Sequence, residues 1–464
     1  MATKGQGSGR AALVGRILRY AFAIGILYLV VTTVPWMDRL EYQADAAEDA
    51  RVLTGQISGD WNTAEIEFTV RSLPELPSDE SKFSAFDRAI TSGQIAAETR
   101  LQVDATQITH SFAGDLKRHV GSVSWRPGMP SAFRQLDVRD LMPALGFLIL
   151  GSIFAVTRWW RLLLLIGCKV RLTDTLRLTY IGLFFNLVLP GLNGGDVARG
   201  VLVVRENPEH RANALMSVFV DRMLGLLAMI ALATLATFIV GEPLADLRLP
   251  VLATLLAVVL GLSAFLNSGV RRLTRFDRIV DRLPQSDRLR KLDRALVEYA
   301  AHPGPIALAL ILSVGNHASV TAAIFSLGRA FGDTLQPIQY LATVTVTNTL
   351  TSLPIAPGGW GVGEAAFRTF FVQLGSVATL GVAVSVTYRL MNAALGLAGG
   401  IFLLLPSGRA VRAHLSEDPA ATELDPDTAA IGLDQDPAAI GLEENGPEGG
   451  DSNSESRSTP PAAD

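Results

Sequence analysis

Two glycine-rich segments interrupt apolar stretches of the sequence, and each ends in a carboxylate. The first break, residues 189–196, reads Leu-Pro-Gly-Leu-Asn-Gly-Gly-Asp; the second break, residues 353–364, reads Leu-Pro-Ile-Ala-Pro-Gly-Gly-Trp-Gly-Val-Gly-Glu. Proline lacks a backbone donor and glycine tolerates conformations that end a helix, so both breaks leave main-chain groups unpaired. Inside a membrane such groups must face protein or a water-filled cavity. The breaks therefore predict a polar cavity within an apolar helical domain.

A helix that begins after each glycine pair would present free N–H groups and a positive partial charge, which suit an anionic headgroup. Asp196 and Glu364 would then lie in the first turns of these helices. Two roles stay open for these carboxylates. They would cap and pair with the helix dipole, or they would pair with a buried arginine or bind a coupling proton or cation.

An arginine follows each glycine pair at a similar distance, again within an apolar stretch: Arg222 and Arg389. A charge near the bilayer centre costs roughly 2.5–3.5 kcal/mol on the lenient insertion scale, so it normally faces a cavity and has a partner. We expect Arg222 to pair with Asp221 or with Asp196. Three roles stay open for both arginines: a structural ion pair, contact with a phosphate, or snorkelling to an interface.

The candidate binding residues are those of the two breaks and the arginines that follow. They are Asn193, Gly194, Gly195, Asp196, Arg199, Arg222, Gly358, Gly359, Glu364 and Arg389. Titratable groups in or beside apolar segments are candidates for proton or ion coupling, namely Asp196, Asp221, His317 and Glu364. For His317 an interhelical hydrogen bond is the ordinary alternative.

The composition is that of an integral membrane protein, since 49% of the 464 residues are hydrophobic and only 18% are charged. The single cysteine excludes an internal disulfide. No metal-ligand cluster, nucleophilic triad or phosphate loop with its flanking strand and helix is visible. We therefore expect no catalytic residues, no metal, no cofactor and no nucleic-acid partner.

The predicted fold class is an all-α polytopic membrane protein with about eight transmembrane helices plus two re-entrant or broken helices in two related halves. A small mixed α/β extracytoplasmic domain is inserted before most of them, because polarity rises after residue 37 and residues 64–70 alternate like a half-buried strand. The expected parts are a signal-anchor helix (1–37), this extracytoplasmic domain (38–140), the transmembrane domain (141–405) and a disordered acidic cytoplasmic tail (406–464).

Several spans follow from apolar runs within the transmembrane domain. The expected full spans are residues 141–156, 215–240, 250–266, 305–327, 338–353 and 374–405, with shorter pieces at 178–189 and 365–374. Basic residues after the first span predict a cytoplasmic loop: Arg158, Arg161, Lys169, Arg171 and Arg177. Residues 271–294 predict an amphipathic helix on the cytoplasmic surface or a plain solvated helix.

Four motifs, taken in order, resemble the lysylphosphatidylglycerol synthase transmembrane (flippase-like) family. They lie at residues 158–163, 189–199, 221–225 and 353–364, and the resemblance covers about 141–405. It implies a polytopic helical domain with re-entrant segments, associated in that family with moving lipids or lipid-linked groups between leaflets. It also implies that headgroup or gating residues are Asp196, Arg199, Arg222, Glu364 and Arg389.

Two features depart from that family. Full-length synthases carry a large soluble aminoacyl-transfer domain after the membrane region, whereas a short tail follows here, so synthase activity is not expected. The domain at residues 38–140 is also outside the usual pattern. It would bind an extracytoplasmic protein partner, receive the lipid, or be a passive insertion.

We therefore expect a multi-pass protein of the bacterial cytoplasmic membrane, with both termini cytoplasmic, that translocates an anionic phospholipid or a polyprenyl-phosphate-linked lipid. We expect a transporter rather than an enzyme, and the enzyme question stays open. Two alternatives stay open: a membrane-embedded transferase that uses Asp196 and Glu364 as catalytic carboxylates on a lipid-linked substrate, or a non-transporting scaffold. Dependence on a divalent metal and a soluble donor would favour the transferase, and activity with lipid alone would favour the transporter.

Overall fold

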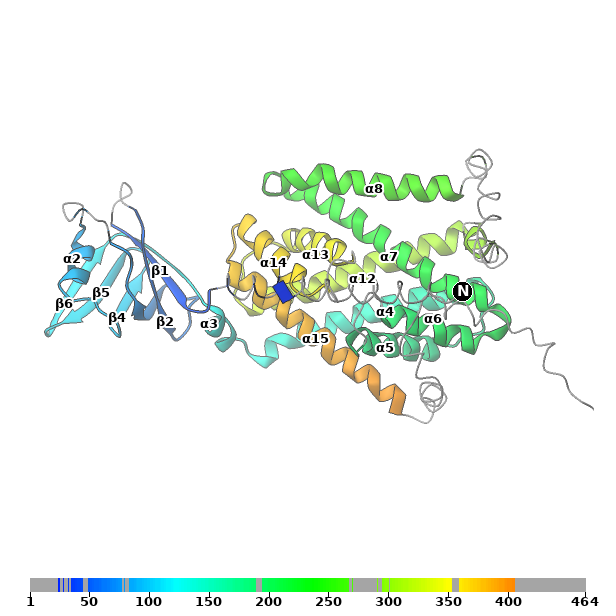
Figure 1. The fold of residues 1–464 in the computed structure, drawn as a ribbon, viewed down its shortest axis with the longest axis horizontal. Helices are drawn as coiled ribbons and strands as arrows, with labels where there is room; N and C mark the ends of the chain where they lie inside the picture. The colour runs from blue at the N-terminus through cyan, green and yellow to red at the C-terminus, as the bar shows by residue number, and fades with distance from the viewer. Residues whose placement is uncertain are drawn as a thin grey trace, which may run out of the picture. The chain divides into compact units, whose positions relative to one another are not determined.

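The computed structural model describes residues 24–25, 28, 32, 35–44, 49–76, 79, 83–188, 194–266, 269, 290, 294–299, 301–352 and 359–404. A domain of β-strands comes first and a mostly helical domain follows it (Figure 1). The signal anchor, the amphipathic segment at 271–294 and the acidic tail lie wholly or almost wholly outside the described residues.

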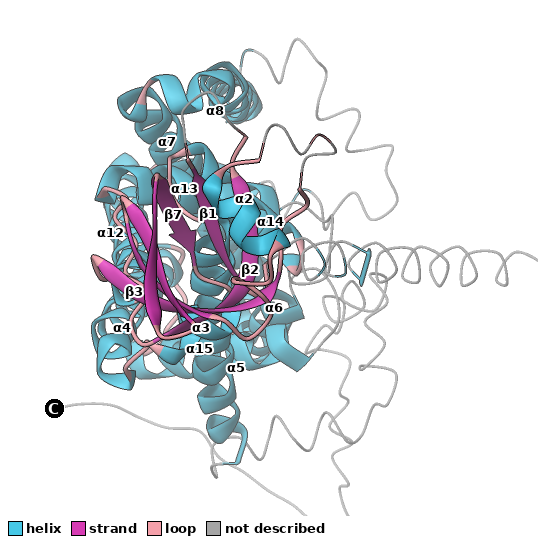
Figure 2. Ribbon diagram, turned by 90° about the vertical axis from the view of Figure 1, so that its left-hand side faces the viewer, coloured by secondary structure: helices cyan, strands magenta, loops and turns pink. Residues whose placement is uncertain are grey.

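Seven strands form one antiparallel sheet in the order β6-β5-β4-β3-β2-β1-β7. Their bounds are Asp38–Gln43 (β1), Arg51–Ser58 (β2), Glu65–Ser72 (β3), Arg100–Asp104 (β4), Gln107–Phe112 (β5), Asp115–Val120 (β6) and Ser122–Arg126 (β7). Ile66, Phe68 and Val70 of β3 are buried, as the predicted alternation requires. The short helix α2 (Ala85–Thr91) buries Phe86 in the same core. Figure 2 shows the strands of this domain in magenta.

Strands β6 and β7 lie at opposite ends of this order, although only Gly121 separates them in sequence. Val120 of β6 pairs with Gln107 of β5, and Ser122 of β7 pairs with Gln43 of β1. The two strands therefore act as one bent strand that joins both edges. Glycine is needed at the bend, because a side chain there would overlap the carbonyl of Gln43.

The helices of the second domain differ in length in a way that separates spans from shorter pieces. Their bounds are Met129–Arg134 (α3), Leu141–Leu165 (α4), Leu172–Val188 (α5), Gly194–Glu206 (α6), Arg211–Val240 (α7), Ala245–Leu266 (α8), Pro303–Ala330 (α12), Pro337–Ser352 (α13), Val362–Gln373 (α14) and Ala378–Leu404 (α15). Within the described residues, five helical segments are long and apolar enough to cross a membrane, those containing α4, α7, α8, α12 and α15.

The positions of most predicted spans agree with these helices. The span predicted at 338–353 corresponds to α13, whose 16 residues fall short of the roughly 20 that a perpendicular span requires. The short pieces predicted at 178–189 and 365–374 fall within α5 and α14. The total of about eight spans stays a prediction.

The loop predicted after the first span is wrong for three of its five basic residues. Arg158 and Arg161 lie inside α4, and Arg177 lies inside α5, so only Lys169 and Arg171 occupy the turn between the two helices. The helix continues past residue 156 because Arg158 finds a buried carboxylate partner there. An internal ion pair thus removes the cost that made a loop the expected reading.

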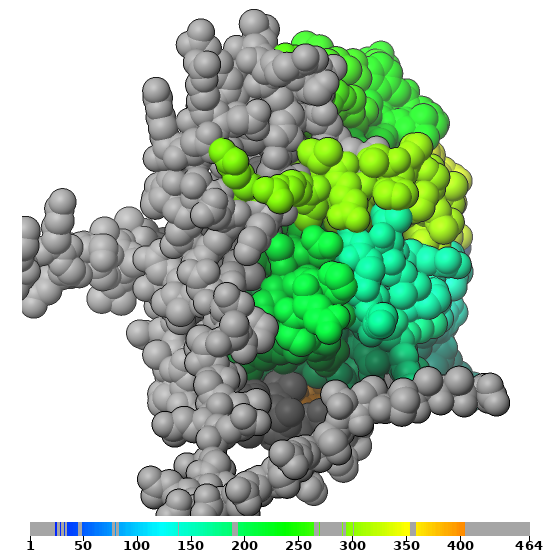
Figure 3. All heavy atoms as spheres, turned by 90° about the vertical axis from the view of Figure 1, so that its right-hand side faces the viewer, coloured from blue at the N-terminus to red at the C-terminus, as the bar shows by residue number. Residues whose placement is uncertain are grey.

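The contacts among the helices follow a repeating pattern. Helix α4 packs along α12, while α5 packs on α15 and α13 packs on α7. The neighbouring pairs α5–α6 and α6–α7 have counterparts in α13–α14 and α14–α15. Exchanging α4–α7 for α12–α15 converts each of these contacts into another that is observed. Figure 3 shows one face of the molecule on which α4 and α5 (teal) adjoin α12 (yellow-green).

Glycines allow two of these contacts to be unusually close. On α15, a side chain at Gly399 would overlap the carbonyl of Tyr180, so α15 can lie directly against α5 only with glycine there. On α6, a side chain at Gly195 would overlap the carbonyl of Gly182 on α5. Helices approach to backbone contact where such small residues face each other.

Candidate functional site

The first break is followed at once by helix α6, whose start is fixed against α5. The Gly195 N–H donates to the side-chain oxygen of Asn186 at 2.8 Å, which satisfies one of the free donors at the helix N-terminus. Asp196 is the third residue of α6 and carries its charge into the first turn, where the helix dipole favours an anion. Asn193 lies outside the described residues.

Five charged side chains meet beside this helix start, and we call them the first charge cluster: Arg158, Asp196, Arg199, Asp221 and Arg222. Asp196 forms an ion pair with Arg222 and lies 3.6 Å from Arg199. Asp221 lies 2.7 Å from the Nε of Arg158 and 3.6 Å from Arg199. Of the two partners expected for Arg222, the structure thus selects Asp196, while Asp221 serves the other two arginines.

Further side chains hold this cluster between α4, α7 and α12. Arg158 donates a second hydrogen bond, at 2.8 Å, to the hydroxyl of Ser313 on α12. The guanidinium of Arg199 lies 3.9 Å above the ring of Trp159, within cation–π range. His317 forms a 3.0 Å hydrogen bond with the carbonyl of Gly225 through its Nε2. The interhelical hydrogen bond expected as the ordinary role of His317 is therefore present.

The first charge cluster carries a surplus of positive charge. Its three arginines face two carboxylates, which leaves one unit of positive charge when all five groups are ionised. The side chain of Arg222 is 44% exposed, whereas that of Asp196 is 12% exposed. The Nε–H of Arg199 has no hydrogen-bond partner among the described residues. The cluster can therefore accept an anion through donors that the protein leaves unused.

The second break leads into α14 with a related arrangement. The N–H of Gly361 donates to Glu364 at 2.7 Å, so Glu364 caps the helix N-terminus. Glu364 also forms an ion pair with Arg389, which donates to the carbonyl of Gly359 at 2.6 Å and lies 5.0 Å from the ring centre of Trp360. Capping and arginine pairing, kept apart as alternatives by the sequence, occur together.

Arg368 lies one turn after Glu364 on α14. Its Nε is buried without a hydrogen-bond partner in the described part of the chain. We call Glu364, Arg368 and Arg389 the second charge cluster. Arg389 forms the ion pair with Glu364, and the spacing of four residues places Arg368 on the same side of α14 as Glu364. These three groups together carry one positive charge when all are ionised.

The two ion pairs at the breaks occupy equivalent places. Asp196 and Glu364 are the third residues of α6 and α14. Their partners Arg222 and Arg389 are the twelfth residues of α7 and α15, which begin at Arg211 and Ala378. Each half of the contact pattern thus places one carboxylate from a short helix against one arginine from the following long helix.

Most of the expected site residues lie in one of these two clusters or at its glycines. Gly358 lies outside the described residues, as Asn193 does. The sequence analysis did not include Arg158 or Ser313 among the candidate site residues. Arg158 was assigned to a loop, although its position two residues after an apolar run and beside two tryptophans was a signal that the helix continues.

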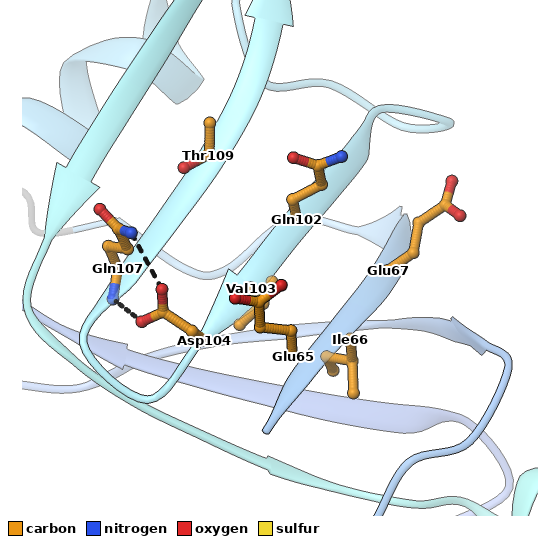
Figure 4. A pocket seen from close by; sticks show the side chains of 8 residues that line it. All are labelled: Glu65, Ile66, Glu67, Gln102, Val103, Asp104, Gln107 and Thr109. Carbon is orange, nitrogen blue, oxygen red and sulfur yellow. Dashed lines mark hydrogen bonds between the residues drawn. The ribbon is translucent and has the colours of Figure 1, made fainter. Parts of the chain in front are cut away.

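The sheet domain carries a polar groove of about 330 Å³ on the face opposite its core (Figure 4). Its lining residues are Glu65, Ile66, Glu67, Gln102, Val103, Asp104, Gln107 and Thr109. Hydrogen bonds from Thr106 and Gln107 lower the pKa of Asp104 to about 2. Among the described residues, no group of three or more His, Cys, Asp or Glu side chains is placed to hold a metal ion.

Comparison with known proteins identifies the helical domain. A family model described as the lysylphosphatidylglycerol synthase TM region matches residues 127–400, more than half of the chain. The match includes both charge clusters and begins after the last strand of the sheet domain. No curated protein matches the chain.

Proposed function

Because the chain belongs to the family of the lysylphosphatidylglycerol synthase transmembrane region, with a lipid-related role in the membrane, we propose that it moves an anionic lipid between leaflets. The observation that carries this proposal is the surplus arginine charge of both clusters at the breaks. The substrate is a phospholipid or a polyprenyl-phosphate-linked lipid, since both present a phosphate to the protein.

Charge balance favours an anion over a neutral or cationic headgroup. An unpaired guanidinium in an apolar surrounding is costly, and a phosphate oxygen offers it a strong, geometrically matched acceptor. Arg222, partly exposed, would contact the phosphate first, in competition with Asp196. Arg199 would follow, because its Nε–H is unused.

The distribution of basic residues supports an orientation for the spans. Arginine and lysine crowd into residues 166–211 and 267–302, whereas residues 331–377 contain Arg368 as their only basic residue. Under the positive-inside rule the first two segments are cytoplasmic and the third is outside. The sheet domain is then extracytoplasmic, and the N-terminus and the tail are cytoplasmic, as in a bacterial cytoplasmic membrane protein.

This orientation makes the two halves opposite in direction. With five spans in the order α4, α7, α8, α12 and α15, helix α4 runs inward and α12 runs outward. The pair α5–α6 would then enter from the cytoplasmic side and α13–α14 from the outer side, as re-entrant segments. Inverted halves with broken helices that meet at a substrate site are a recurring transporter design.

A transferase would need Asp196 or Glu364 as a free base or nucleophile. Both carboxylates are instead paired with arginines, and Glu364 also caps α14. These contacts favour a binding role over a catalytic one.

The test is leaflet exchange of a fluorescent phosphatidylglycerol in proteoliposomes, comparing the native chain with Asp196→Asn and Arg222→Lys at matched incorporation. A charge-assisted hydrogen bond is worth about 1.5–3 kcal/mol, so we expect exchange to slow by roughly ten- to a hundredfold. Arg71→Lys, in an exposed ion pair of the sheet domain, is the matched control and should exchange like the native chain.

Exchange that persists at the native rate in both cluster variants would contradict a pathway at the first break. No exchange of phosphatidylglycerol or of a polyprenyl phosphate by the native chain would contradict the transport function itself.

A further inference from the structure

One face of α13 carries a line of hydroxyl groups, which we call the hydroxyl stripe: Tyr340, Thr343, Thr347 and Thr351. Spacings of three and four residues place them above one another on the same side of the helix. Tyr340, Thr343 and Thr347 are at most 1% exposed. The stripe is therefore a polar line within a buried, apolar surrounding.

Threonines inside a helix usually satisfy their hydroxyl by bonding to the carbonyl four residues earlier. Thr345 and Thr349, on another side of α13, do so at 2.6 and 2.7 Å. The hydroxyls of Thr343 and Thr347 have no hydrogen-bond partner among the described residues. Thr343 and Thr347 thus behave differently from these two threonines, because their hydroxyls stay available for another partner. Thr351, at the end of the stripe, donates to the carbonyl of Asn348 at 3.2 Å.

A carboxylate lies at each end of the stripe. At one end the Tyr340 hydroxyl donates to Asp333 at 2.6 Å, and Asp333 is itself buried. At the other end Thr351 lies beside Gly359 and Gly363, against which the guanidinium of Arg389 is also packed. Arg389 is the partner of Glu364. The stripe therefore extends from Asp333 toward the second charge cluster.

The spacing of the stripe suits water. Side chains four residues apart on a helix have Cβ atoms about 5–6 Å apart. Two O–H···O hydrogen bonds of about 2.7–2.8 Å through one water molecule cover the same distance. The hydroxyls of Thr343, Thr347 and Thr351 can therefore be joined by single waters, each with the two polar partners that a buried water needs.

We propose that the hydroxyl stripe conducts protons between Asp333 and Glu364, so that lipid movement is coupled to a proton. This inference rests on the proposed transport function. When a lipid phosphate takes Arg389, the Glu364 carboxylate loses its cation and accepts a proton from a hydronium ion, leaving water. When the lipid departs, Glu364 returns the proton to water and pairs with Arg389 again.

The charged groups around the path are few. Arg389 of α15 faces Glu364, with Arg368 one turn further along α14. Near Asp333, Arg329 of α12 donates to its main-chain carbonyl at 2.8 Å. Helix α7, which also packs on α13, carries its charges at Arg211, Asp221 and Arg222, and the last two belong to the first charge cluster.

The experiment uses the full chain in vesicles of phosphatidylcholine that contain a labelled phosphatidylglycerol and an internal pH dye. The label distribution between leaflets is measured without a pH gradient and with a gradient of about one unit, in which one proton per lipid biases the distribution about tenfold. The test variant is Thr343→Val/Thr347→Val, which keeps side-chain shape and removes both hydroxyls. Thr345→Val/Thr349→Val is the matched control, and Thr343→Ser/Thr347→Ser restores the hydroxyls.

We expect the native chain, the control and the serine variant to accumulate label along the gradient. The valine variant of the stripe should spread the label evenly, while it still exchanges lipid without a gradient. Even spreading by the native chain, or unchanged accumulation by the valine variant, overturns the proton path but leaves lipid transport standing. If the native chain exchanges no lipid, the transport function fails instead. The internal dye then tests the path by the rate at which protons enter after the outside is acidified. Equal rates in native and valine vesicles overturn the path, and a faster rate with the native chain supports it.

Discussion

Removing one side of the buried pair Arg158–Asp221 should destabilise the helical domain far more than an ordinary surface charge does. The two side chains are 8% and 4% exposed and their atoms approach to 2.7 Å. In Asp221→Asn, Arg158 loses its charged partner and keeps its bond to the neutral hydroxyl of Ser313. Arg199 keeps its 3.6 Å approach to Asp196 and its place above the ring of Trp159, but loses its second carboxylate. Breaking a buried pair in this way costs about 3–5 kcal/mol, against about 0–1 kcal/mol at the surface.

The assay is thermal unfolding of the full chain in detergent, followed by tryptophan fluorescence. With roughly 2–4 °C per kcal/mol for a domain of this size, we expect Asp221→Asn to lower the apparent Tm by at least about 6 °C. The control Glu67→Gln breaks an exposed pair with Arg100. The two side chains are 44% and 79% exposed, so this change should shift Tm by no more than about 4 °C.

A second variant separates loss of the pair from general damage. Arg158→Met/Asp221→Leu removes both charges and refills their space with apolar side chains, which is often neutral for a buried pair. It should recover at least about half of the stability lost in Asp221→Asn. The reasoning is refuted if Asp221→Asn melts like the control, or if the double variant is as unstable as the sum of Arg158→Met and Asp221→Leu.

Other consequences are directly measurable. Gly195→Ala should lower the free energy of unfolding by about 1–3 kcal/mol, because the added methyl overlaps the carbonyl of Gly182. The control Gly146→Ala, whose methyl meets nothing within 4 Å, should be neutral or slightly stabilising. Melting temperatures that do not separate the two variants would contradict the close α5–α6 contact. In the sheet domain, burial lowers the pKa of both His110 and His119. The unfolded chain therefore binds protons first as the pH falls below about 6.5. The free energy of unfolding should then drop by up to about 1.4 kcal/mol per pH unit for each histidine. Melting between about pH 8 and about pH 5 measures this, and a flat profile would show that the two rings are charged or solvated in the fold.

The sequence predicted best the carboxylates that end the two breaks and the arginines that follow them. A carboxylate after a glycine pair and an arginine within an apolar stretch each need a partner in a membrane. This requirement gave Asp196 as one of two candidate partners of Arg222, and the structure shows that pair. The same reasoning did not find Arg158 as the partner of Asp221, because it considered only Arg222. The choice depends on how α4 packs against α7, which no local pattern reports.

Arg158 shows why the remainder was missed. Basic residues after an apolar run normally mark a loop, and that rule holds for Lys169 and Arg171 in the turn between α4 and α5. It fails at Arg158 because a distant carboxylate and the hydroxyl of Ser313 neutralise the cost of burial. Contacts between residues far apart in sequence decided this case.

The sheet domain was predicted as a mixed domain with one strand. Its other six strands and their pairing were not predicted. Alternation identified β3 because half of each strand is buried. The bend at Gly121 depends on two pairings, with β5 before it and with β1 after it, that a single glycine in a polar segment does not reveal. Local patterns thus gave the face of the strand but not its neighbours.

The first and last strands of the sheet domain are hydrogen-bonded to each other, and this places its two chain ends together. The N–H of Met129, just after the last strand, donates at 3.1 Å to the carbonyl of Pro35, just before the first. The intervening residues therefore form an inserted domain whose first and last residues are neighbours. Removing the domain would leave only a short gap in the chain. Evolution can exchange such a domain in one event, and a deletion that joins Pro35 to Met129 is the natural way to remove it.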